Sequence, residues 1–285
     1  MSPALQDGAA LADPPVGSRR IDDCLLITET AAGLRRETVA EEVPVALIYN
    51  GTTFAVMLAT PADLDDFGRG FSLTEGIVGA PSDIGPIEVV PVGRGIEVKI
   101  TIDEDWALAL ATRKRALAGR TGCGLCGVDQ FSEALRPVAR VTSALVVAPA
   151  AVRRAMAELP AHQLLNRRVG AVHAAALADR DGHIVALRED VGRHNALDKL
   201  IGAVTADAID VSERFVLVSS RCSYEMVHKT AAAGIGLIAA VSAPTSLAIG
   251  LAAKANVALL GFARDGRFTV YAGAGRIAGA ELHVA

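Results

Sequence analysis

The second half of the chain alternates short apolar runs with helical stretches, and this alternation constrains the fold more than any other feature. The apolar runs include "HAAALAD", "RFVLVSS", "GLIAAVS" and "VALLGFA", and stretches such as "RHNALDKLIGAV" lie between them. Short apolar runs are typical of strands buried on both faces, and their alternation with helices is typical of α/β proteins. Residues 136–285 are therefore predicted to form an α/β sandwich around a mostly parallel central sheet.

The first part of the chain, residues 20–120, has the pattern of a smaller and mainly antiparallel β domain. The dipeptide Asn50-Gly51 separates two alternating runs and is a strong signal for a two-residue hairpin turn. A second hairpin is predicted over 87–103, with its turn at Gly93–Gly95. Both signals predict strand pairs that are antiparallel.

Two helices are predicted within the same region. The first begins at Pro61 and contains Gly68 and Gly70, which weaken a helix because glycine loses more backbone entropy than other residues. The second covers residues 105–119 and ends at a glycine, the residue most often found just after a helix.

Charge and terminal composition limit the classes of protein to which the chain can belong. Its net charge is −4, whereas proteins dedicated to duplex DNA are usually far more basic, so no nucleic-acid partner is expected. Residues 1–19 have neither the basic start nor the apolar centre of a signal peptide and are predicted to form a disordered tail. Without an export signal, the four cysteines are expected to stay reduced in the cytoplasm.

One uncharged segment, residues 231–253, has the length of a transmembrane helix. Gly234, Gly236 and the break "SAPTS" at 242–246 divide it into shorter pieces. We therefore expect a helix end, a buried strand and a buried helix, and no membrane span.

The sequence "TGCGLCG" places Cys123 and Cys126 two residues apart among glycines, and such a pair can hold a metal, cycle a disulfide or carry sulfur. A structural zinc needs four ligands, but the chain has one such pair, and His162 and His173 lack a finger-like spacing. Thioredoxin-like sites follow a strand, whereas a predicted helix precedes this pair. The glycines favour a mobile thiol loop over residues 121–135, which suits a sulfur carrier.

Three polar stretches follow predicted strands and begin helices: "REDVGRHN" (188–195), "SSRCSYE" (219–225) and "SAPTS" (242–246). Ligands of open α/β sheets bind beyond the carboxyl ends of strands, so these stretches are expected to lie together. Arg193 and His194 extend the apolar face of their helix and form either an anion site or a salt-bridged helix start capped by Asp190.

Two further arginine-containing turns each allow a structural and a functional interpretation. Ser219 and Arg221 belong either to a phosphate cradle or to ordinary helix capping beside a small, buried Cys222. Arg264 and Arg267 flank a predicted hairpin turn and are either solvated or in contact with an anionic ligand.

Several motifs in succession resemble the FdhD/NarQ family, the formate dehydrogenase accessory sulfurtransferases. The resemblance covers roughly residues 25–275, and its motifs are "TGCGLCG", "AVHAAALAD", "EDVGRHNALDKLIG", "SSRCSYEMVHK", "VSAPTSLAIGLA" and "GFARDGRFTVYAG". The resemblance implies a homodimer with guanine-nucleotide pockets that can take GDP or GMP. Such a protein receives sulfur from a cysteine desulfurase and passes it to the molybdenum or tungsten bis-pterin guanine dinucleotide cofactor of the formate dehydrogenase catalytic subunit.

The family's functional residues match particular positions of this chain. Cys123 matches the persulfide-forming cysteine, and Cys126 matches the cysteine that assists it. The cofactor-binding stretch matches Phe262, Ala263, Arg264, Asp265, Gly266 and Arg267. With these residues we group Arg193, His194, Ser219 and Arg221 as expected cofactor contacts. The alternative is a non-catalytic, cofactor-binding chaperone of the dehydrogenase with a structural or redox CxxC.

The resemblance also implies that residues 136–285 have a cytidine-deaminase-like α/β/α fold. Zinc deaminases need H-x-E and P-C-x-x-C, but here Ala175 stands two residues after His173 and no P-C-x-x-C follows. We therefore expect no catalytic metal and a pocket reused for cofactor binding. Cys222 stands where the family is expected to carry a small residue, and it either relays sulfur or, the favoured interpretation, fills buried space.

Overall fold

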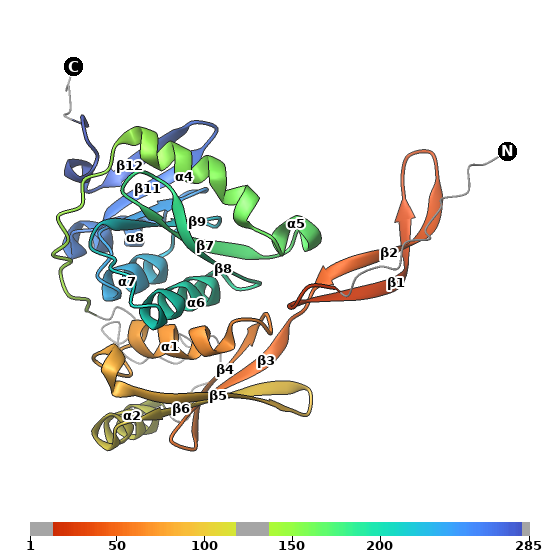
Figure 1. Cartoon of the computed structure of the whole chain (residues 1–285), viewed down its shortest axis with the longest axis horizontal. Helices are drawn as coiled ribbons and strands as arrows, with labels where there is room; N and C mark the ends of the chain where they lie inside the picture. Colours follow the sequence, from red (N-terminus) through yellow and green to blue (C-terminus); the bar gives the residue numbers. More distant parts are fainter. Residues whose placement is uncertain (1–13, 118–136, 281–285) are drawn as a thin grey trace.

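The computed structural model describes residues 14–117 and 137–280 of the chain (Figure 1). The predicted CxxC loop, with Cys123 and Cys126, lies outside the described residues. The described part contains a six-stranded sheet with helices on both faces and a four-stranded sheet that packs below it through helix α1. The chain is therefore a mixed α/β protein, as predicted.

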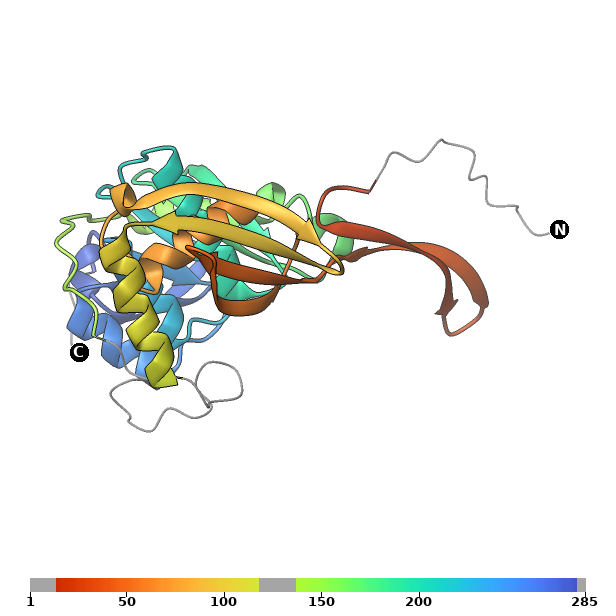
Figure 2. The same cartoon turned by 90° about the horizontal axis from the view of Figure 1, so that it is seen from below.

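Strands β1 (Ser18–Ile27) and β2 (Ala32–Ala40) pair antiparallel and project from the body as an arm (Figures 1 and 2). β1 begins inside the predicted tail 1–19, because its first residues pair with the end of β2. Apolar side chains near the tip are exposed, with 61% for Leu25 and 72% for Ile27. This β1–β2 arm thus contributes little to the core of its own chain.

The four-stranded sheet has the order β4-β3-β6-β5 and is mainly antiparallel, with one parallel pair between β3 and β6. Both predicted hairpins are confirmed, and Asn50 and Gly51 have φ of 44° and 79°, as a two-residue hairpin turn requires. The elements of this part are β3 (Val43–Tyr49), β4 (Thr52–Ala59), α1 (Leu64–Thr74), η1 (Pro81–Asp83), β5 (Ile84–Val92), β6 (Gly95–Ile102) and α2 (Glu104–Leu117).

The six-stranded sheet has the order β12-β11-β10-β9-β7-β8. Helix α4 covers one face, and α6, α7 and α8 cover the other (Figure 1). The elements are α4 (Pro149–His162), α5 (Asn166–Val169), β7 (His173–Asp179), β8 (Ile184–Asp190), α6 (Arg193–Ala206), β9 (Arg214–Val218), α7 (Tyr224–Ala232), β10 (Leu237–Ala240), α8 (Ser246–Ala255), β11 (Ala258–Arg264), β12 (Arg267–Ala272) and η2 (Ala274–Arg276).

The prediction of a mostly parallel sheet is wrong. Only β9/β10 and β10/β11 pair in parallel, while the other three pairings, β7/β8, β7/β9 and β11/β12, are antiparallel. Short connections join β7 to β8 and β11 to β12, and a short connection forces neighbouring strands to run in opposite directions. The carboxyl ends of β8, β9 and β10 still meet at one edge, where the predicted polar stretches lie.

Both faces of the six-stranded sheet are buried, which explains its continuous apolar runs. Along β7, Ala174 and Ala176 pack in the core under α4, while Ala175 and Leu177 pack in the core under α6 and α7. Successive residues of a strand point to opposite faces, and here both faces are buried. The sequence of such a strand therefore does not alternate between apolar and polar residues.

Helices α1 and α6 cross so closely that glycine is required on both. An added methyl group at Gly70 would lie 1.8 Å from the carbonyl oxygen of Asp198, and one at Gly202 would lie 1.9 Å from the carbonyl oxygen of Asp66. Gly68, the other glycine of the predicted helix, is also a contact point, because an added methyl group there would meet the side chain of Val98. The entropy that glycine costs a helix is offset here by the close packing it permits.

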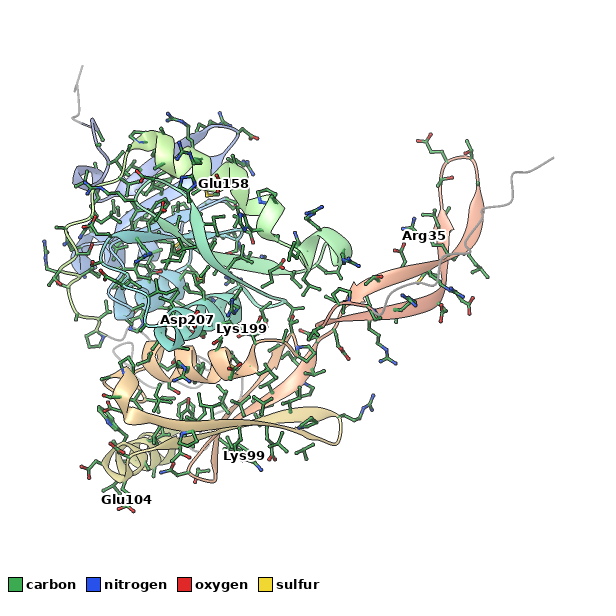
Figure 3. The ribbon with its side chains drawn as sticks, in the orientation of Figure 1. Arg35, Lys99, Glu104, Glu158, Lys199 and Asp207 are labelled. Carbon is green, nitrogen blue, oxygen red and sulfur yellow. The ribbon has the colours of Figure 1, made fainter. Side chains whose placement is uncertain are left out.

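A buried ion pair joins the end of the four-stranded sheet to α6. Lys199 and Asp190 are both fully buried, and their Nζ and Oδ2 atoms lie 2.7 Å apart. Thr60 completes the cluster, because its carbonyl oxygen accepts from Lys199 and its N–H donates to Asp190. Figure 3 shows Lys199 on α6, on the side that faces α1.

A second buried lysine, Lys229 of α7, binds the end of α1. Its Nζ lies 2.9 Å from Asp198 Oδ2, 2.8 Å from Glu75 Oε1 and 3.1 Å from Thr74 Oγ1. Burial alone lowers the pKa of Lys229, but the carboxylates of Asp198 and Glu75 outweigh burial and raise it. The lysine is therefore charged at neutral pH.

The uncharged segment 231–253 is divided as predicted. Helix α7 ends at Ala232, β10 covers Leu237–Ala240 and α8 begins at Ser246. No helix among the described residues is long and apolar enough to cross a membrane.

The variant Gly70→Ala tests the helix crossing. We expect the free energy of unfolding in urea to fall by about 3 kcal/mol, because the methyl group meets a backbone atom that cannot move alone. Gly250→Ala is the matched control in an open position of α8, and it should raise the same quantity by about 0.5 to 1 kcal/mol. Equal stability of the two variants would contradict the packing described above.

Candidate functional site

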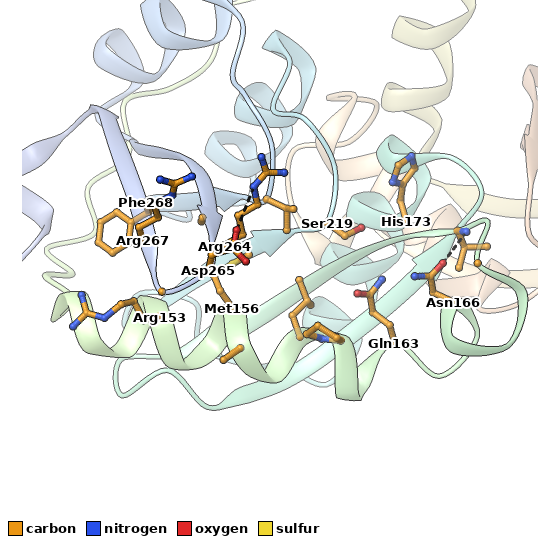
Figure 4. Close-up of a pocket in the computed structure, with 18 residues that line it drawn as sticks. Arg153, Met156, Gln163, Asn166, His173, Ser219, Arg264, Asp265, Arg267 and Phe268 are labelled. Atoms are coloured by element: carbon orange, nitrogen blue, oxygen red, sulfur yellow. Dashed lines mark hydrogen bonds and ion pairs between the residues drawn. The ribbon is translucent and has the colours of Figure 1, made fainter.

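A pocket of about 640 Å³ lies between α4 and the edge of the six-stranded sheet (Figure 4). A volume of this size is in the range that holds one small ligand. Residues from α4, α5, the start of β7, the end of β9 and the β11–β12 turn line it: Arg153, Met156, Ala157, Leu159, Pro160, Gln163, Asn166, Gly170, Val172, His173, Ser219, Val241, Ala263, Arg264, Asp265, Gly266, Arg267 and Phe268.

Three arginines make one end of the pocket cationic. Arg264 and Arg267 flank the β11–β12 turn, and Arg153 lies on α4 (Figure 4). The turn itself is built by Asp265 and Gly266, whose φ values of 54° and 72° suit a tight hairpin. Guanidinium groups bind phosphate and carboxylate oxygens through paired donors, so this end fits an anionic group.

The inner end of the pocket is neutral and rich in hydrogen-bonding groups. Ser219 Oγ accepts from the N–H of Ala174 at 2.8 Å, a bond that leaves the hydroxyl hydrogen for another acceptor. Burial first, and then the charges of Arg193 and His194, lower the pKa of His173 below 6.5. The imidazole is therefore neutral at pH 7, and the inner end carries no charge of its own.

His194 lies outside this pocket, at the start of α6. Its Nε2 contacts Glu225 Oε2 at 2.8 Å and Ser223 Oγ at 3.3 Å, and the bond from His194 holds the pKa of Glu225 below its ordinary value. A nucleophilic triad uses both imidazole nitrogens, one for the hydroxyl and one for the carboxylate. Since both partners share Nε2 here, this trio is a satisfied ion pair and not a nucleophilic site.

The start of α6 also differs from the predicted cap. Gly192 is the N-cap and no side chain caps the helix, whereas Asp190 is committed to Lys199 and to the N–H of Gly192. Arg193 Nε is buried without a hydrogen-bond partner among the described residues.

The turn after β9 is tied to the turn after β10. The N–H of Cys222 donates to the carbonyl oxygen of Ala243, and the N–H of Thr245 donates to the carbonyl oxygen of Cys222. The Cys222 side chain is fully buried, and burial raises the pKa of its thiol from 9.0 to about 12. A thiol in that state is neither a nucleophile nor a sulfur acceptor, so Cys222 fills space, while the neighbouring Arg221 is exposed.

The pocket collects part of the predicted cofactor-binding set. Ser219 and residues 263–267 line it, whereas Arg193, His194 and Arg221 lie at the start of α6 and at the turn after β9 and do not line it. Phe262 does not line it either, and its φ of 50° is unusual for a bulky residue. The carboxyl edge of the sheet therefore carries two groups of predicted residues and not one.

The wall of the pocket that α4 provides was not predicted from the sequence. Arg153, Met156, Pro160 and Gln163 follow one another at intervals of three or four residues, which places them on one face of the helix. This spacing is a readable signal, but on a helix it usually marks the side that faces a core. From the sequence His173 was weighed as a partner of the CxxC pair and as the remaining histidine of a deaminase motif, and not as part of a pocket with α4. No group of three or more potential metal ligands occurs in the described part of the chain.

A model of the FdhD/NarQ family matches residues 40–278 of the chain. The chain belongs to the FdhD/NarQ family. Two similar FdhD/NarQ relatives are both named sulfur carrier protein FdhD. The one from Bordetella petrii is 55% identical and covers 84% of this chain and 86% of its own length, and the one from Cupriavidus necator is 52% identical and covers 84% and 83%.

A crystal structure supports the fold of this FdhD/NarQ protein. The solved protein comes from Desulfotalea psychrophila and is provisionally described as a formate dehydrogenase accessory protein. The match has a TM-score of 0.70 and covers 91% of this chain and 99% of the solved one, at 24% sequence identity.

The burial of Cys222 predicts its reactivity. With iodoacetamide at pH 8, peptide mapping should show slow modification of Cys222 and much faster modification of the partly exposed Cys24. Because the pKa of Cys222 is raised on folding, the buried thiol stabilises the fold fully below about pH 9, and this stabilisation is lost as the pH rises toward 12. Both cysteines should react equally in guanidinium chloride, and rapid labelling of Cys222 in the native protein would contradict its burial.

Proposed function

We propose that this chain is a cytoplasmic sulfur carrier for formate dehydrogenase. It would take sulfane sulfur from a cysteine desulfurase on Cys123 and transfer it to the bis-pterin guanine dinucleotide cofactor before the dehydrogenase receives that cofactor. The observation that carries the proposal is the 55% identity, over 84% of the chain, to a protein named sulfur carrier protein FdhD.

The pocket is the site proposed for the guanine-nucleotide end of the cofactor. Three arginines at one end suit phosphate groups, and the neutral inner end suits an uncharged ring. We assign residues 136–285 a cytidine-deaminase-like fold, in which the position of the proton-shuttling glutamate is held by Ala175, a fully buried apolar residue. The pocket would therefore bind the nucleotide without deaminating it.

The sulfur chemistry is assigned to the CxxC pair. The Cys123 thiolate attacks the terminal sulfur of the donor persulfide, the donor S–S bond breaks, and the donor leaves as a thiolate. The Cys126 thiolate then attacks the inner sulfur of the Cys123 persulfide, which releases sulfide and forms a Cys123–Cys126 disulfide. The disulfide carries the two oxidising equivalents of the sulfane sulfur, and a dithiol reductant returns the pair to thiols.

A homodimer fits one described feature of the chain. The β1–β2 arm exposes apolar side chains and, as a hairpin of two strands, has little stability of its own in water.

The second candidate function is a non-catalytic carrier of the finished cofactor, and the cationic pocket suits it equally well. The two candidates differ in what happens at Cys123.

Mass spectrometry of the intact protein separates these candidates. After incubation with a cysteine desulfurase and cysteine, the wild-type chain should gain one sulfur atom, and Cys123→Ala should gain none. Cys126→Ala should hold the persulfide but release no sulfide when a cofactor acceptor is added. Cys24→Ala is the control and should behave as wild type, whereas a Cys123→Ala protein that still sulfurates the cofactor would exclude the mechanism.

The pKa of His173 reports on the occupant of the pocket. In the free protein its NMR titration should have a midpoint below 6.5, because burial and nearby cations favour the neutral ring. Bound GDP should lower that midpoint further, since the ring would cover the imidazole while the phosphates stay at the arginine end. The double variant Arg264→Ala/Arg267→Ala should show no such fall at the same GDP concentration, and an unchanged midpoint at saturating GDP in the wild type would contradict the proposed site.

A further inference from the structure

Gln163 is the one residue of the pocket whose polar group is both buried and unpaired among the described residues. Its side chain is 6% exposed, and its Nε2 has no hydrogen-bond partner. It extends from the end of α4 toward Ser219 and His173 (Figure 4). Burying an amide without a hydrogen bond is unfavourable, so native proteins rarely keep such a group unless something else binds it.

The backbone around Gln163 is held in place by hydrogen bonds. Its carbonyl oxygen accepts from the N–H of Arg167 at 3.0 Å. The next residues are fixed to β8, because the N–H groups of Leu165 and Asn166 both donate to the carboxylate of Glu189, at 2.8 and 2.9 Å. The side chain of Gln163 therefore enters the pocket from a fixed point of the backbone.

The neighbours of Gln163 make other hydrogen bonds. Ser219 Oγ accepts from the N–H of Ala174, Asn166 Oδ1 accepts from the N–H of Val172 at 3.3 Å, and neither bonds to Gln163 Nε2. The arginines lie at the opposite end of the pocket, on the β11–β12 turn and the first half of α4 (Figure 4). The pocket thus has a cationic end for phosphate and a separate, neutral donor for an uncharged ring.

We propose that Gln163 is a specificity residue that donates a hydrogen bond from Nε2 to the carbonyl edge of a bound 6-oxopurine. This inference rests on the proposed function, because it concerns the nucleotide end of the same cofactor. Adenine presents an amino group where a 6-oxopurine presents an acceptor. A site whose buried donor is left unpaired rejects the wrong ring.

Binding of GDP, IDP, ADP and pyrophosphate by isothermal calorimetry tests the assignment. The wild type should bind GDP and IDP similarly, because both carry the carbonyl edge, and should bind ADP about tenfold more weakly. Gln163→Leu and Gln163→Glu should each weaken GDP binding about tenfold and leave pyrophosphate binding unchanged. Glu158→Gln, on an outer position of α4 (Figure 3), is the control and should bind all four as the wild type does.

Stability separates a binding role from a structural one. Replacing an unpaired buried amide by an apolar group of similar size should leave the urea midpoint of Gln163→Leu unchanged or raised. A clear loss of stability, or equal loss of GDP and pyrophosphate binding, would overturn the assignment in favour of a structural role. Unchanged or tighter GDP binding by Gln163→Glu would also overturn it, because a carboxylate cannot donate to a carbonyl.

The outcomes also separate this inference from the proposed pocket. If Arg264→Ala loses pyrophosphate while both Gln163 variants bind GDP normally, the pocket stands and the role of Gln163 is wrong. If the wild type binds neither GDP nor pyrophosphate, the pocket itself is not the nucleotide site.

Discussion

The close crossing of α1 and α6 is the contact on which the rest of the structure depends. At Gly70 and Gly202 the two helix backbones touch, which leaves no room for side chains between them. The contact brings Thr60 to Lys199 and Thr74 to Asp198, so the buried lysines acquire their partners only when the helices are in place. Removing one partner from a buried ion pair typically costs about 3 to 5 kcal/mol, so the pairs also enforce the crossing.

This arrangement explains why charged residues of the two most polar motifs do not line the pocket. In "EDVGRHNALDKLIG" and "SSRCSYEMVHK", Asp190, Asp198, Lys199 and Lys229 hold the N-terminal sheet against α6 and α7. The pocket lies on the other side of the six-stranded sheet, under α4. The buried ion pairs and the residues that line the pocket therefore occupy opposite faces of one sheet, with His173 at the edge between them.

Much of the fold could be predicted from the sequence, because hairpin turns and apolar runs are local signals. Asn50-Gly51 and Asp265-Gly266 mark their turns through residues that accept positive φ. The direction of β9 against β7 was missed because the strand order places these two side by side, and no local signal encodes that neighbour. The partners of Lys229 were missed because Thr74 lies 155 residues away along the chain. Gln163 was missed because an unpaired amide is a property of its surroundings and not of its spacing.

The buried pair of Lys199 also bears on how the chain is made. Its partner Thr60 precedes it by 139 residues, so the N-terminal sheet and α1 leave the ribosome long before α6 exists. Until α6 arrives, Gly70 of α1 lacks the backbone against which it packs, and contacts between such distant segments form slowly. Although the chain divides into two sheets, the side of α1 that faces α6 is therefore covered only when synthesis has reached the second sheet.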